Sequence, residues 1–324
     1  VQVRPTGDAI YDSDIFPTSA YISGKQGRDI SYDPLEIMVE EAHRQGLAIE
    51  AWINPYRVSF NTSYSQLSKD NPARKWHESS NASERRNVLS YNGQLYYNPS
   101  KPEVRQLIID GVEEIVRNYD VDGIHMDDYF YPSFSSSNYN KTFDAQEYNA
   151  STEKQNGMSI KNYRRKQVNK LVKGIKKAID AIDPDVVFGI SPAGNIDSLN
   201  SKYSYYVNIK KWTNSTKFVD YIAPQIYWGF SHKTAKFDRM TDRWADMVDQ
   251  SKVKLYIGIP AYKMGQPSNG TTKAERKELK SKTLLKKMAK YVVKNDIDGI
   301  IVFDYADLNK TACKKLAKYL KKTY

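Results

Sequence analysis

Short β-rich runs alternate with longer amphipathic stretches along the whole chain, and this alternation limits the possible folds more than any other feature. The predicted helices carry typical boundary signals, such as Asp33-Pro34 and Lys101-Pro102 at two starts and Gly46 after one end. Strands and helices that alternate in this way form a parallel sheet covered by helices. The predicted strands are Val1–Pro5, Leu47–Asn54, Asp122–Asp127, Val186–Ser191, Phe218–Tyr227, Leu255–Pro260 and Gly299–Asp304. The predicted helices are Pro34–Gln45, Pro102–Tyr119, Asn162–Ile182, Thr234–Gln250, Leu279–Asn295 and Asn309–Lys322.

This pattern predicts the α/β class and a TIM-type (β/α)8 barrel. The length of 324 residues fits one such barrel with insertions. A closed barrel of this type needs eight strands, so we expect the first strand and helix upstream of residue 1 or supplied by another segment. An open doubly wound sheet is the alternative, but no glycine-rich phosphate loop follows a predicted strand. Residues 1–324 are predicted to form a single catalytic domain with long loop insertions at about 58–100 and 133–157.

Composition narrows the class of protein. The sequence has no run of 18 apolar residues, so no transmembrane segment is predicted. The single cysteine, Cys313, falls on the apolar stripe of the last predicted helix, and we expect it to be a small buried hydrophobe. The chain shows no signal peptide and begins with a strand-like run, which suggests that upstream sequence has been removed.

The net charge of +11 favours anionic partners in general. Much of the excess lies in amphipathic stretches at Lys161–Lys177, Lys273–Lys290 and Lys310–Lys322, and solvated helix faces are the favoured explanation. Aromatic residues reach 12%, with 25 Tyr and 5 Trp, which suits a protein that stacks flat rings against sugars. Tyrosines that are half-buried amphipathic surface residues are the structural alternative.

Strand parity predicts one site. Alternate residues of a barrel strand face the interior, and the others face the helices. The apolar sets of the second and third predicted strands belong to the helix side, which leaves polar residues inside. Their C-terminal ends meet on the face where barrel enzymes keep their chemistry. The inward residues include Arg4, Glu50, Trp52, Asn54, His125, Asp127, Gln225, Tyr227 and Asp304.

Asp127 and Asp128 are the strongest catalytic candidates. Cleavage of a glycosidic bond needs an acid that protonates the leaving oxygen and commonly a second carboxylate as base or nucleophile. Asp127 is expected to enter the pocket, while Asp128 lies just beyond the strand, and Asp304 is the preferred partner. A structural network of buried charges and a metal site that includes His125 are alternatives. Only four His and no His-x-His pair are present, so no metal is predicted. Ser191 has no Gly-x-Ser-x-Gly elbow for serine chemistry.

Aromatic and polar residues near the same strand ends are predicted to bind substrate. Trp52, Tyr56, Tyr129, Tyr131, Tyr227 and Trp228 would stack on sugar rings. The alternative is that some of them plug the barrel mouth, and this applies most to Trp228, whose parity faces the helices. The side chains of Arg4, Asn54 and Arg57 could hydrogen-bond hydroxyls or a carboxylate of the sugar.

Several motifs resemble a known bacterial family, glycosyl-hydrolase-like family ten, first described as a domain of unknown function. The motifs are Val3-Arg4-Pro5 with Gly7-Asp8-Ala9, Ala51-Trp52-Ile53-Asn54-Pro55-Tyr56-Arg57, Asp122-Gly123-Ile124-His125-Met126-Asp127-Asp128-Tyr129-Phe130-Tyr131-Pro132, Ile190-Ser191-Pro192-Ala193-Gly194-Asn195, Ala223-Pro224-Gln225-Ile226-Tyr227-Trp228 and Gly258-Ile259-Pro260-Ala261-Tyr262. The resemblance implies a TIM-type barrel and a glycosidase, and some members act on peptidoglycan, including as lytic transglycosylases.

A more distant similarity links the chain to chitinase-like barrels, whose fourth strand ends in Asp-x-Asp-x-Glu. His125, Asp127 and Tyr129 occupy those positions, so a tyrosine stands in place of the acidic Glu. The chitinase mechanism therefore cannot be carried over, and Asp127, Asp128 or another loop must supply the acid.

These inferences give one leading hypothesis. The protein is expected to cleave bacterial cell-wall glycan, most plausibly peptidoglycan, as a hydrolase or lytic transglycosylase with an aspartic acid as general acid/base. We expect a secreted or cell-surface monomer that uses no cofactor and does not bind nucleic acid. A non-catalytic glycan-binding barrel is the alternative from another class, and nucleic-acid binding rests on charge alone.

Overall fold

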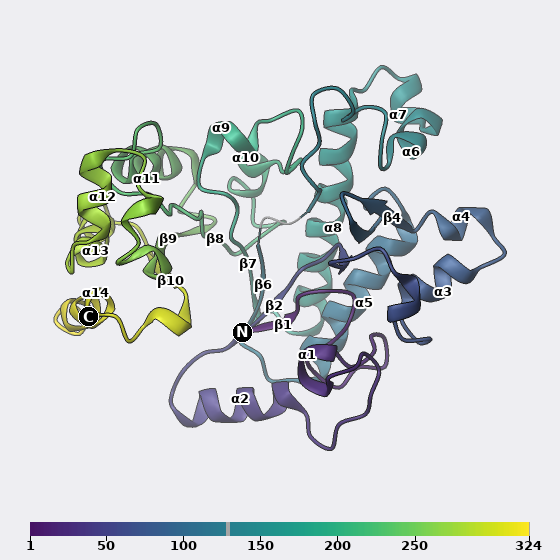
Figure 1. Cartoon of the computed structure of the whole chain (residues 1–324), viewed down its shortest axis with the longest axis horizontal. Coiled ribbons are helices and arrows are strands. Elements are labelled where there is room, and N and C mark those ends of the chain that lie inside the picture. The colour runs from purple at the N-terminus through teal and green to yellow at the C-terminus, as the bar shows by residue number, and fades with distance from the viewer. Residues whose placement is uncertain (128–129, 324) are drawn as a thin grey trace. The chain divides into compact units, whose positions relative to one another are not determined.

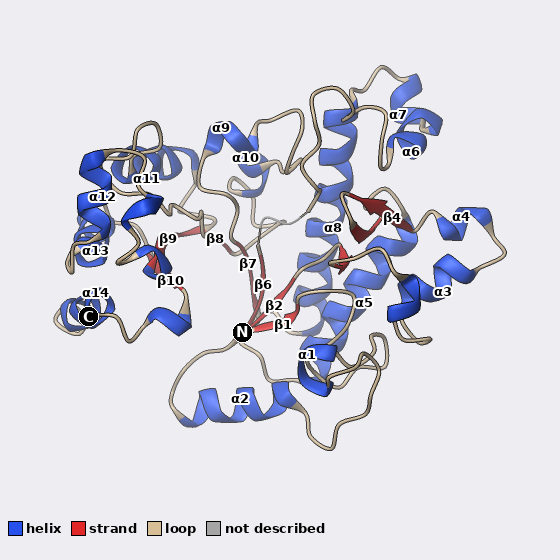
Figure 2. Cartoon of the chain, in the orientation of Figure 1, coloured by secondary structure: helices blue, strands red, loops and turns tan. Residues whose placement is uncertain are grey.

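The computed structural model describes residues 1–127 and 130–323, and Figures 1 and 2 show the course of the chain and its secondary structure. Each of the seven segments predicted as a strand contains a strand of the structure. The predicted α/β class is therefore confirmed. These strands form a parallel sheet in the order β1-β2-β6-β7-β8-β9-β10. Their bounds are β1 (Gln2–Arg4), β2 (Glu50–Ile53), β6 (Gly123–Met126), β7 (Val187–Ile190), β8 (Tyr221–Ile222), β9 (Lys254–Pro260) and β10 (Gly299–Phe303). The eighth strand remains a prediction.

The six predicted helices are also present. They are α2 (Pro34–Arg44), α5 (Pro102–Asn118), α8 (Ile160–Ile182), α11 (Phe237–Met247), α13 (Leu284–Lys294) and α14 (Thr311–Leu320). The start of α2 illustrates why the boundaries could be predicted. Asp33 is its N-cap, and Asp33 Oδ1 accepts hydrogen bonds from the N–H groups of Leu35 and Glu36 at 2.9 and 3.4 Å. Pro34 has no N–H group and stands at the first helical position, where none is needed.

Internal contacts divide the chain into two compact units. The first comprises residues 1–189 and 200–208, and the second comprises residues 190–199 and 209–324. The first unit contains β1, β2, β6 and most of β7, and the second contains β8, β9 and β10. The prediction of a single catalytic domain remains a prediction.

In the first unit, α5 packs against α8. The stripe of α5 that includes Val104, Ile108 and Val112 has no exposed surface, as expected for the apolar face of a helix that covers a sheet. Gly111 on the same helix faces the ring of Phe16, and a Cβ there would lie 2.6 Å from Phe16 Cε2. This glycine lets the segment after β1 lie directly on the helix.

In the second unit, α13 packs with α14 and α11. Cys313 of α14 is 5% exposed, so the prediction of a buried small hydrophobe is confirmed. None of the helices in the described part of the chain is long and apolar enough to cross a membrane.

The first insertion has more structure than the predicted loop. It contains a three-stranded antiparallel sheet in the order β3-β5-β4, together with short helices. The strands are β3 (Arg57–Ser59), β4 (Val88–Tyr91) and β5 (Gln94–Tyr97), and the helices are α3 (Pro72–Glu78) and α4 (Ala82–Arg85). Asn92 and Gly93 join β4 to β5 with positive φ angles of 48° and 75°, as a two-residue hairpin turn requires.

The second insertion contains two short helices, α6 (Ala145–Ala150) and α7 (Thr152–Gln155). Both helices pack on α8. Tyr148 of α6 packs with Tyr163 of α8 in a small buried cluster, with the two ring centroids 5.4 Å apart. The insertion is therefore fixed to the body of the first unit by its own core.

Candidate active site at the strand ends

Strands β2 and β6 lie side by side and share one face. Glu50 pairs with Gly123, and Trp52 pairs with His125. Their partners on the other face, Ala51, Ile53, Ile124 and Met126, are at most 1% exposed, whereas Glu50, Trp52 and His125 are partly exposed. The parity prediction is therefore confirmed for Glu50, Trp52 and His125.

The shared face forms a compact polar and aromatic group. The rings of Trp52 and His125 meet edge to face, with centroids 6.2 Å apart and planes at 89°. Glu50 Oε2 lies 3.8 Å from His125 Nδ1, which is too long for a hydrogen bond. A Cβ at Gly123 would lie 2.9 Å from Glu50 Cγ and 2.8 Å from Val187 Cγ2, so only glycine leaves room for the glutamate.

His125 is a neutral imidazole at neutral pH. Its side chain is 15% exposed, and this burial lowers the pKa of His125 to about 3 because the charged form loses hydration. A neutral ring offers one N–H donor and one acceptor nitrogen. His125 is thus suited to hydrogen-bond a polar group at the strand ends without adding a charge.

Asp127 follows β6 directly. It is 5% exposed, and its expected inward orientation stays a prediction. The next two predicted site residues, Asp128 and Tyr129, lie outside the described residues. Phe130 and Tyr131 resume the described chain and are both buried. The carboxyl group of Asp127 thus lies in a largely water-excluded position.

The predicted inward orientation of Arg4 is wrong. A register shift between Gln2 and Arg4 pairs Gln2 with Trp52 but Arg4 with Ile53, so Arg4 shares the helix-side face of Ile53. An extra residue in one strand changes parity in this way. The Arg4 guanidinium lies 4.7 Å from the centre of the Phe16 ring and is 1% exposed. Arg4 therefore lies on the face opposite to Trp52 and supports the segment after β1.

The residues after β2 form a tight turn. Asn54 Oδ1 accepts a hydrogen bond from the N–H of Arg57 at 3.2 Å, and Arg57 begins β3 with its guanidinium 4.8 Å from the centre of the Phe60 ring. Tyr56 has no exposed surface, and its ring packs 6.5 Å from that of Tyr131. The stacking prediction for Tyr56 is therefore wrong, because the ring has no free face for a sugar.

The second unit carries a separate aromatic cluster at the ends of its strands. The ring of Tyr227 stacks on Phe303 at 5.8 Å and 17° and meets Tyr262 edge to face at 5.7 Å. Asp304 comes directly after Phe303, and the Phe303–Asp304 peptide is cis. Among the described residues, no group hydrogen-bonds the buried Asp304 Oδ1. The predicted carboxylate and the predicted aromatic residue thus belong to the same part of the second unit.

Gln225 and Trp228 lie beside this cluster in sequence but differ in environment. Gln225 Nε2 donates to the carbonyl oxygen of Ser191 at 2.8 Å, so this amide is engaged in backbone support. Trp228 is half-buried, with its ring 5.7 Å from that of His232. Neither contact tests substrate binding, so the substrate-binding role of Gln225 and Trp228 stays a prediction.

Tyr262 and Phe303 were not predicted as site residues. Tyr262 follows β9, and Phe303 ends β10, so both occupy strand ends in the sequence pattern. Position at or just after the end of a strand was therefore an available signal for both.

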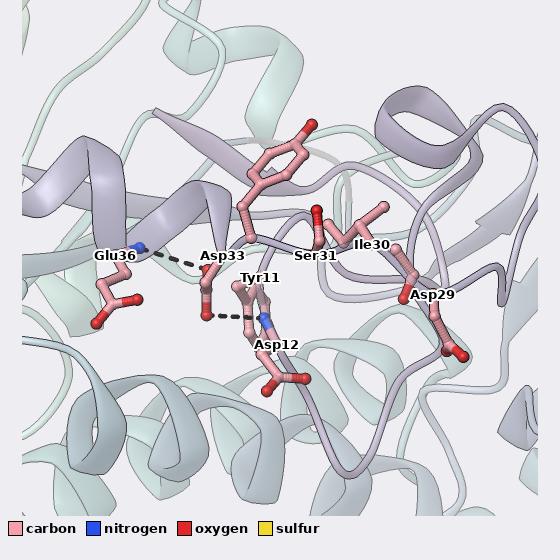
Figure 3. Close-up of a pocket in the computed structure, with 9 residues that line it drawn as sticks. Tyr11, Asp12, Asp29, Ile30, Ser31, Asp33 and Glu36 are labelled. Atoms are coloured by element: carbon pink, nitrogen blue, oxygen red, sulfur yellow. Dashed lines mark hydrogen bonds between the residues drawn. The ribbon is translucent and has the colours of Figure 1, made fainter.

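A pocket of about 430 Å3 lies apart from the predicted residues in the first unit. Figure 3 shows it beside the start of α2, where Asp33 accepts hydrogen bonds from the N–H groups of Asp12 and Glu36. None of the predicted site residues lines it. Within the described ranges, no three His, Cys, Asp or Glu side chains are arranged to hold a metal ion. The metal alternative gains no support from those residues.

Comparison with known proteins identifies the family. The family model described as Glycosyl hydrolase-like 10 matches residues 1–274. The chain belongs to this family. The match includes Asp127 and the aromatic residues Trp52 and Tyr227, but it ends before Asp304. The resemblance inferred from the motifs is therefore confirmed.

The curated relatives are longer than the part of them that aligns with this chain. The glycosyl hydrolase YngK of Bacillus subtilis (strain 168) is 37% identical over 328 residues, which cover 96% of this chain and 60% of YngK. The glycosyl hydrolase DigH of Escherichia coli (strain K12) is 34% identical over 340 residues, which cover 98% of this chain and 74% of DigH. The chain thus spans about three fifths of the length of YngK.

Solved structures confirm the fold class. The glycoside hydrolase domain of PgaB (BpsB) from Bordetella bronchiseptica superposes with a TM-score of 0.61 at 12% identity, covering 98% of this chain and 87% of that domain. The α-L-fucosidase isoenzyme 2 from Paenibacillus thiaminolyticus gives a TM-score of 0.53 at 14% identity, covering 99% of this chain and 44% of that one. These neighbours agree with the barrel-type fold that the sequence predicts for this member of the Glycosyl hydrolase-like 10 family.

Proposed function

We propose that this protein cleaves glycosidic bonds in bacterial cell-wall glycan, with peptidoglycan as the substrate. The observation that carries the proposal is the buried Asp127 at the end of β6, next to a strand face that bears Trp52 and His125. Membership of a glycosyl-hydrolase-like family supports the same reaction class.

In the proposed reaction, an aspartic acid at the end of β6 is the general acid. Asp127 is the first candidate because it is buried at the end of β6, on the strand that carries His125. The acid donates its proton to the scissile oxygen while the bond from that oxygen to the anomeric carbon breaks. The resulting aspartate then accepts a proton from the attacking group.

Two groups can capture the oxocarbenium-like centre. Attack by water gives hydrolysis, and attack by the 6-hydroxyl of the same sugar gives an anhydro product, as in a lytic transglycosylase. The second route requires a single acid/base and no nucleophilic carboxylate. Asp304 is the candidate second carboxylate for the first route. Trp52, Tyr129, Tyr227 and Trp228 are the candidate stacking residues, and Asn54, Arg57, His125 and Gln225 are the candidate polar contacts.

The neutral state of His125 fits this proposal. A cationic imidazole beside the acid would favour the aspartate form and weaken the general acid. Burial instead keeps the pKa of His125 near 3, so the ring can orient a sugar hydroxyl by hydrogen bonding without adding a positive charge.

Mass spectrometry of digested peptidoglycan tests the proposal. Purified peptidoglycan is incubated with the wild type and with Asp127→Asn, Asp128→Asn and Asp304→Asn, and the released muropeptides are compared. We expect products from the wild type and a loss of about 10² to 10⁴-fold in rate when the general acid is changed. Products lighter by one water identify a transglycosylase.

The variants separate the candidate roles. An Asp304→Asn variant that retains full rate would remove the second carboxylate and leave the single-acid route. Release of no product by a folded wild type, in a chain of the full length of its relatives, would contradict cleavage of peptidoglycan and leave glycan binding as the function to test. We further propose a secreted or cell-surface location. We also propose a monomeric state, and size-exclusion chromatography with light scattering checks the oligomeric state.

A further inference from the structure

The positive charge of the protein is concentrated at one end of the sequence. Residues 271–324 contain fourteen Lys and one Arg against six Asp and Glu, a net charge of +9, while the whole chain carries +11. The first 270 residues are therefore nearly neutral. General solvation of helix faces does not explain this difference, because long exposed helices occur in both parts of the chain.

Three helices of the second unit carry this charge. They are α12 (Lys273–Leu279), α13 and α14, which Figure 1 shows in the green to yellow part of the chain. Helices α13 and α14 contain no acidic residue. The carboxylates of α12 point back into the unit, where Glu275 accepts from the N–H of Gly229 and Glu278 accepts from Ser231.

The lysines repeat along each helix, and all of those named here on α13 and α14 except the half-buried Lys286 are exposed. Lys286, Lys290 and Lys294 follow one another at four-residue spacing on α13, as do Lys314 and Lys318 on α14. Like charges at this spacing destabilise a helix. Helix α8 of the first unit also has lysines at this spacing, but two of its lysines are paired, Lys166 with Glu153 and Lys176 with Asp180, each at less than 3 Å. An uncompensated row of this kind indicates a surface selected for a ligand.

A basic hollow adjoins these helices. Its volume is about 520 Å3, and four of its six lining residues are cationic. They are Lys273, Arg276, Lys277 and Lys280, and Pro267 and Ser268 complete the lining. The hollow offers a place where several cations can surround one anionic group.

The chemistry of the surface selects among anionic ligands. Lysine ammonium groups act as point charges that contact phosphates in any orientation, without the planar fork that arginine uses for specific recognition. Leu285, Met288 and Leu316 of α13 and α14 are buried and cannot enter a bilayer, while the exposed Tyr305 and Leu308 precede α14 and lie outside the three helices. The half-buried Tyr319 has Lys286 and Lys290 at about 6 Å from its ring, which leaves no open stacking platform for bases.

We propose that α12, α13 and α14 form a binding surface for a flexible phosphodiester polymer of the bacterial wall, of the polyol phosphate type. The choice of a wall polymer rests on the proposed function, because the substrate glycan of that proposal lies in the same wall. The surface would hold the enzyme at the wall through many weak contacts that release counterions.

Binding of the full chain to synthetic poly(glycerol phosphate) tests this proposal. The test variant is Lys314→Gln/Lys315→Gln/Lys318→Gln on α14, and the matched control is Lys170→Gln/Lys173→Gln/Lys177→Gln on α8. All six lysines are exposed, and both variants lose the same charge. Glutamine keeps a helix propensity close to that of lysine, so both variants are expected to fold, which circular dichroism verifies.

We expect wild-type binding to weaken steeply between about 50 and 200 mM salt. The α14 variant should bind roughly tenfold more weakly with a shallower salt slope, while the α8 variant stays within about twofold. Equal losses in both variants would overturn the proposal. So would tighter binding to double-stranded DNA with the same number of phosphates, or to vesicles that contain phosphatidylglycerol.

The polymer test is separable from the test of catalysis. Binding is measured in the absence of glycan, and glycan cleavage is measured in the absence of the polymer. The α14 variant should cleave isolated, phosphate-free peptidoglycan at the wild-type rate. Failure of cleavage with retained polymer binding would contradict the proposed function alone, whereas failure of polymer binding with retained cleavage would contradict this surface alone.

Discussion

Asp144 and Arg164 form an ion pair in the interior of the first unit, and neither side chain has exposed surface. Arg164 Nη2 lies 2.7 Å from Asp144 Oδ1, and Nε donates to the same oxygen at 2.7 Å. Tyr131 and Ser100 each donate a hydroxyl to Asp144 Oδ2 at 2.8 Å. The pair therefore holds Tyr131, where the described chain resumes four residues after Asp127.

Removal of one member of the pair should be strongly destabilising. Arg164→Met leaves the Asp144 carboxylate buried without its cation, and we expect a loss of about 3–5 kcal/mol in the free energy of unfolding. Urea denaturation followed by fluorescence measures the change. The control is Arg243→Met, because the Arg243–Asp197 pair is largely exposed and should cost at most about 1 kcal/mol. Equal effects of the two substitutions would contradict a special role for the buried pair.

The sequence could predict the strands and helices that carry the fold because their signals are local. Alternation of β-rich and amphipathic segments found all seven strands of the parallel sheet, and Asp33-Pro34 marked the start of α2. The segment predicted as a strand at 218–227 forms regular structure only at Tyr221–Ile222, because Pro224 lacks an N–H and interrupts the ladder. The small sheet of the first insertion was missed although Asn92-Gly93 is a strong hairpin signal.

The site could be predicted only in part. Parity identified the shared face of Glu50, Trp52 and His125, since the two strands are regular. It failed for Arg4 because one register shift exchanges the faces of a strand, and a shift of this kind has no signal in a run as short as Val1–Pro5. Burial of Tyr56 depends on packing against Tyr131, which is distant in sequence and could not be inferred from the neighbours of Tyr56.

Trp52 should contribute to substrate binding if the proposed function is right. Trp52→Ala removes the ring that faces the strand ends, and we expect kcat/KM for peptidoglycan to fall by about tenfold, or roughly 1.4 kcal/mol, mainly through KM. Trp76→Ala is the control, because Trp76 packs on Tyr97 in the first insertion and is not a predicted site residue. A Trp52→Ala enzyme with wild-type KM would argue against stacking at this position.

Glu275 should hold the segment that follows Tyr227 and Trp228. Burial alone would raise the pKa of Glu275, but hydrogen bonds from the N–H groups of Gly229 and Thr271 outweigh it and hold the pKa below its usual value. Glu275→Ala removes acceptors for both donors, and we expect a loss of about 2–4 kcal/mol in unfolding free energy. Thermal denaturation measures the loss.

The pH dependence checks the charge of Glu275. Because its pKa is lowered on folding, its contribution is present above the unfolded pKa of about 4.5 and is lost as the pH falls through the folded value. The difference in stability between the wild type and Glu275→Ala should therefore narrow below about pH 4.5. A difference that stays constant there would indicate that the carboxyl group is not charged in the folded protein.

His125 provides a second pH-dependent prediction, in which stability is lost as the pH falls below about 6.5. The unfolded chain takes up a proton near pH 6.5, whereas burial lowers the pKa of the folded His125 to about 3, so the folded state binds fewer protons between these values. The stability from the neutral ring is complete above about pH 6.5 and declines as the pH falls. By pH 5 the wild type should lose about 2 kcal/mol of unfolding free energy that His125→Gln does not lose.

Urea denaturation of both proteins at pH 8 and pH 5 measures this difference, and the pH 8 comparison accounts for lost packing. A stability gap that is the same at both pH values would show that His125 is protonated in the folded protein, and its role as a neutral hydrogen-bonding group beside Asp127 would have to be abandoned.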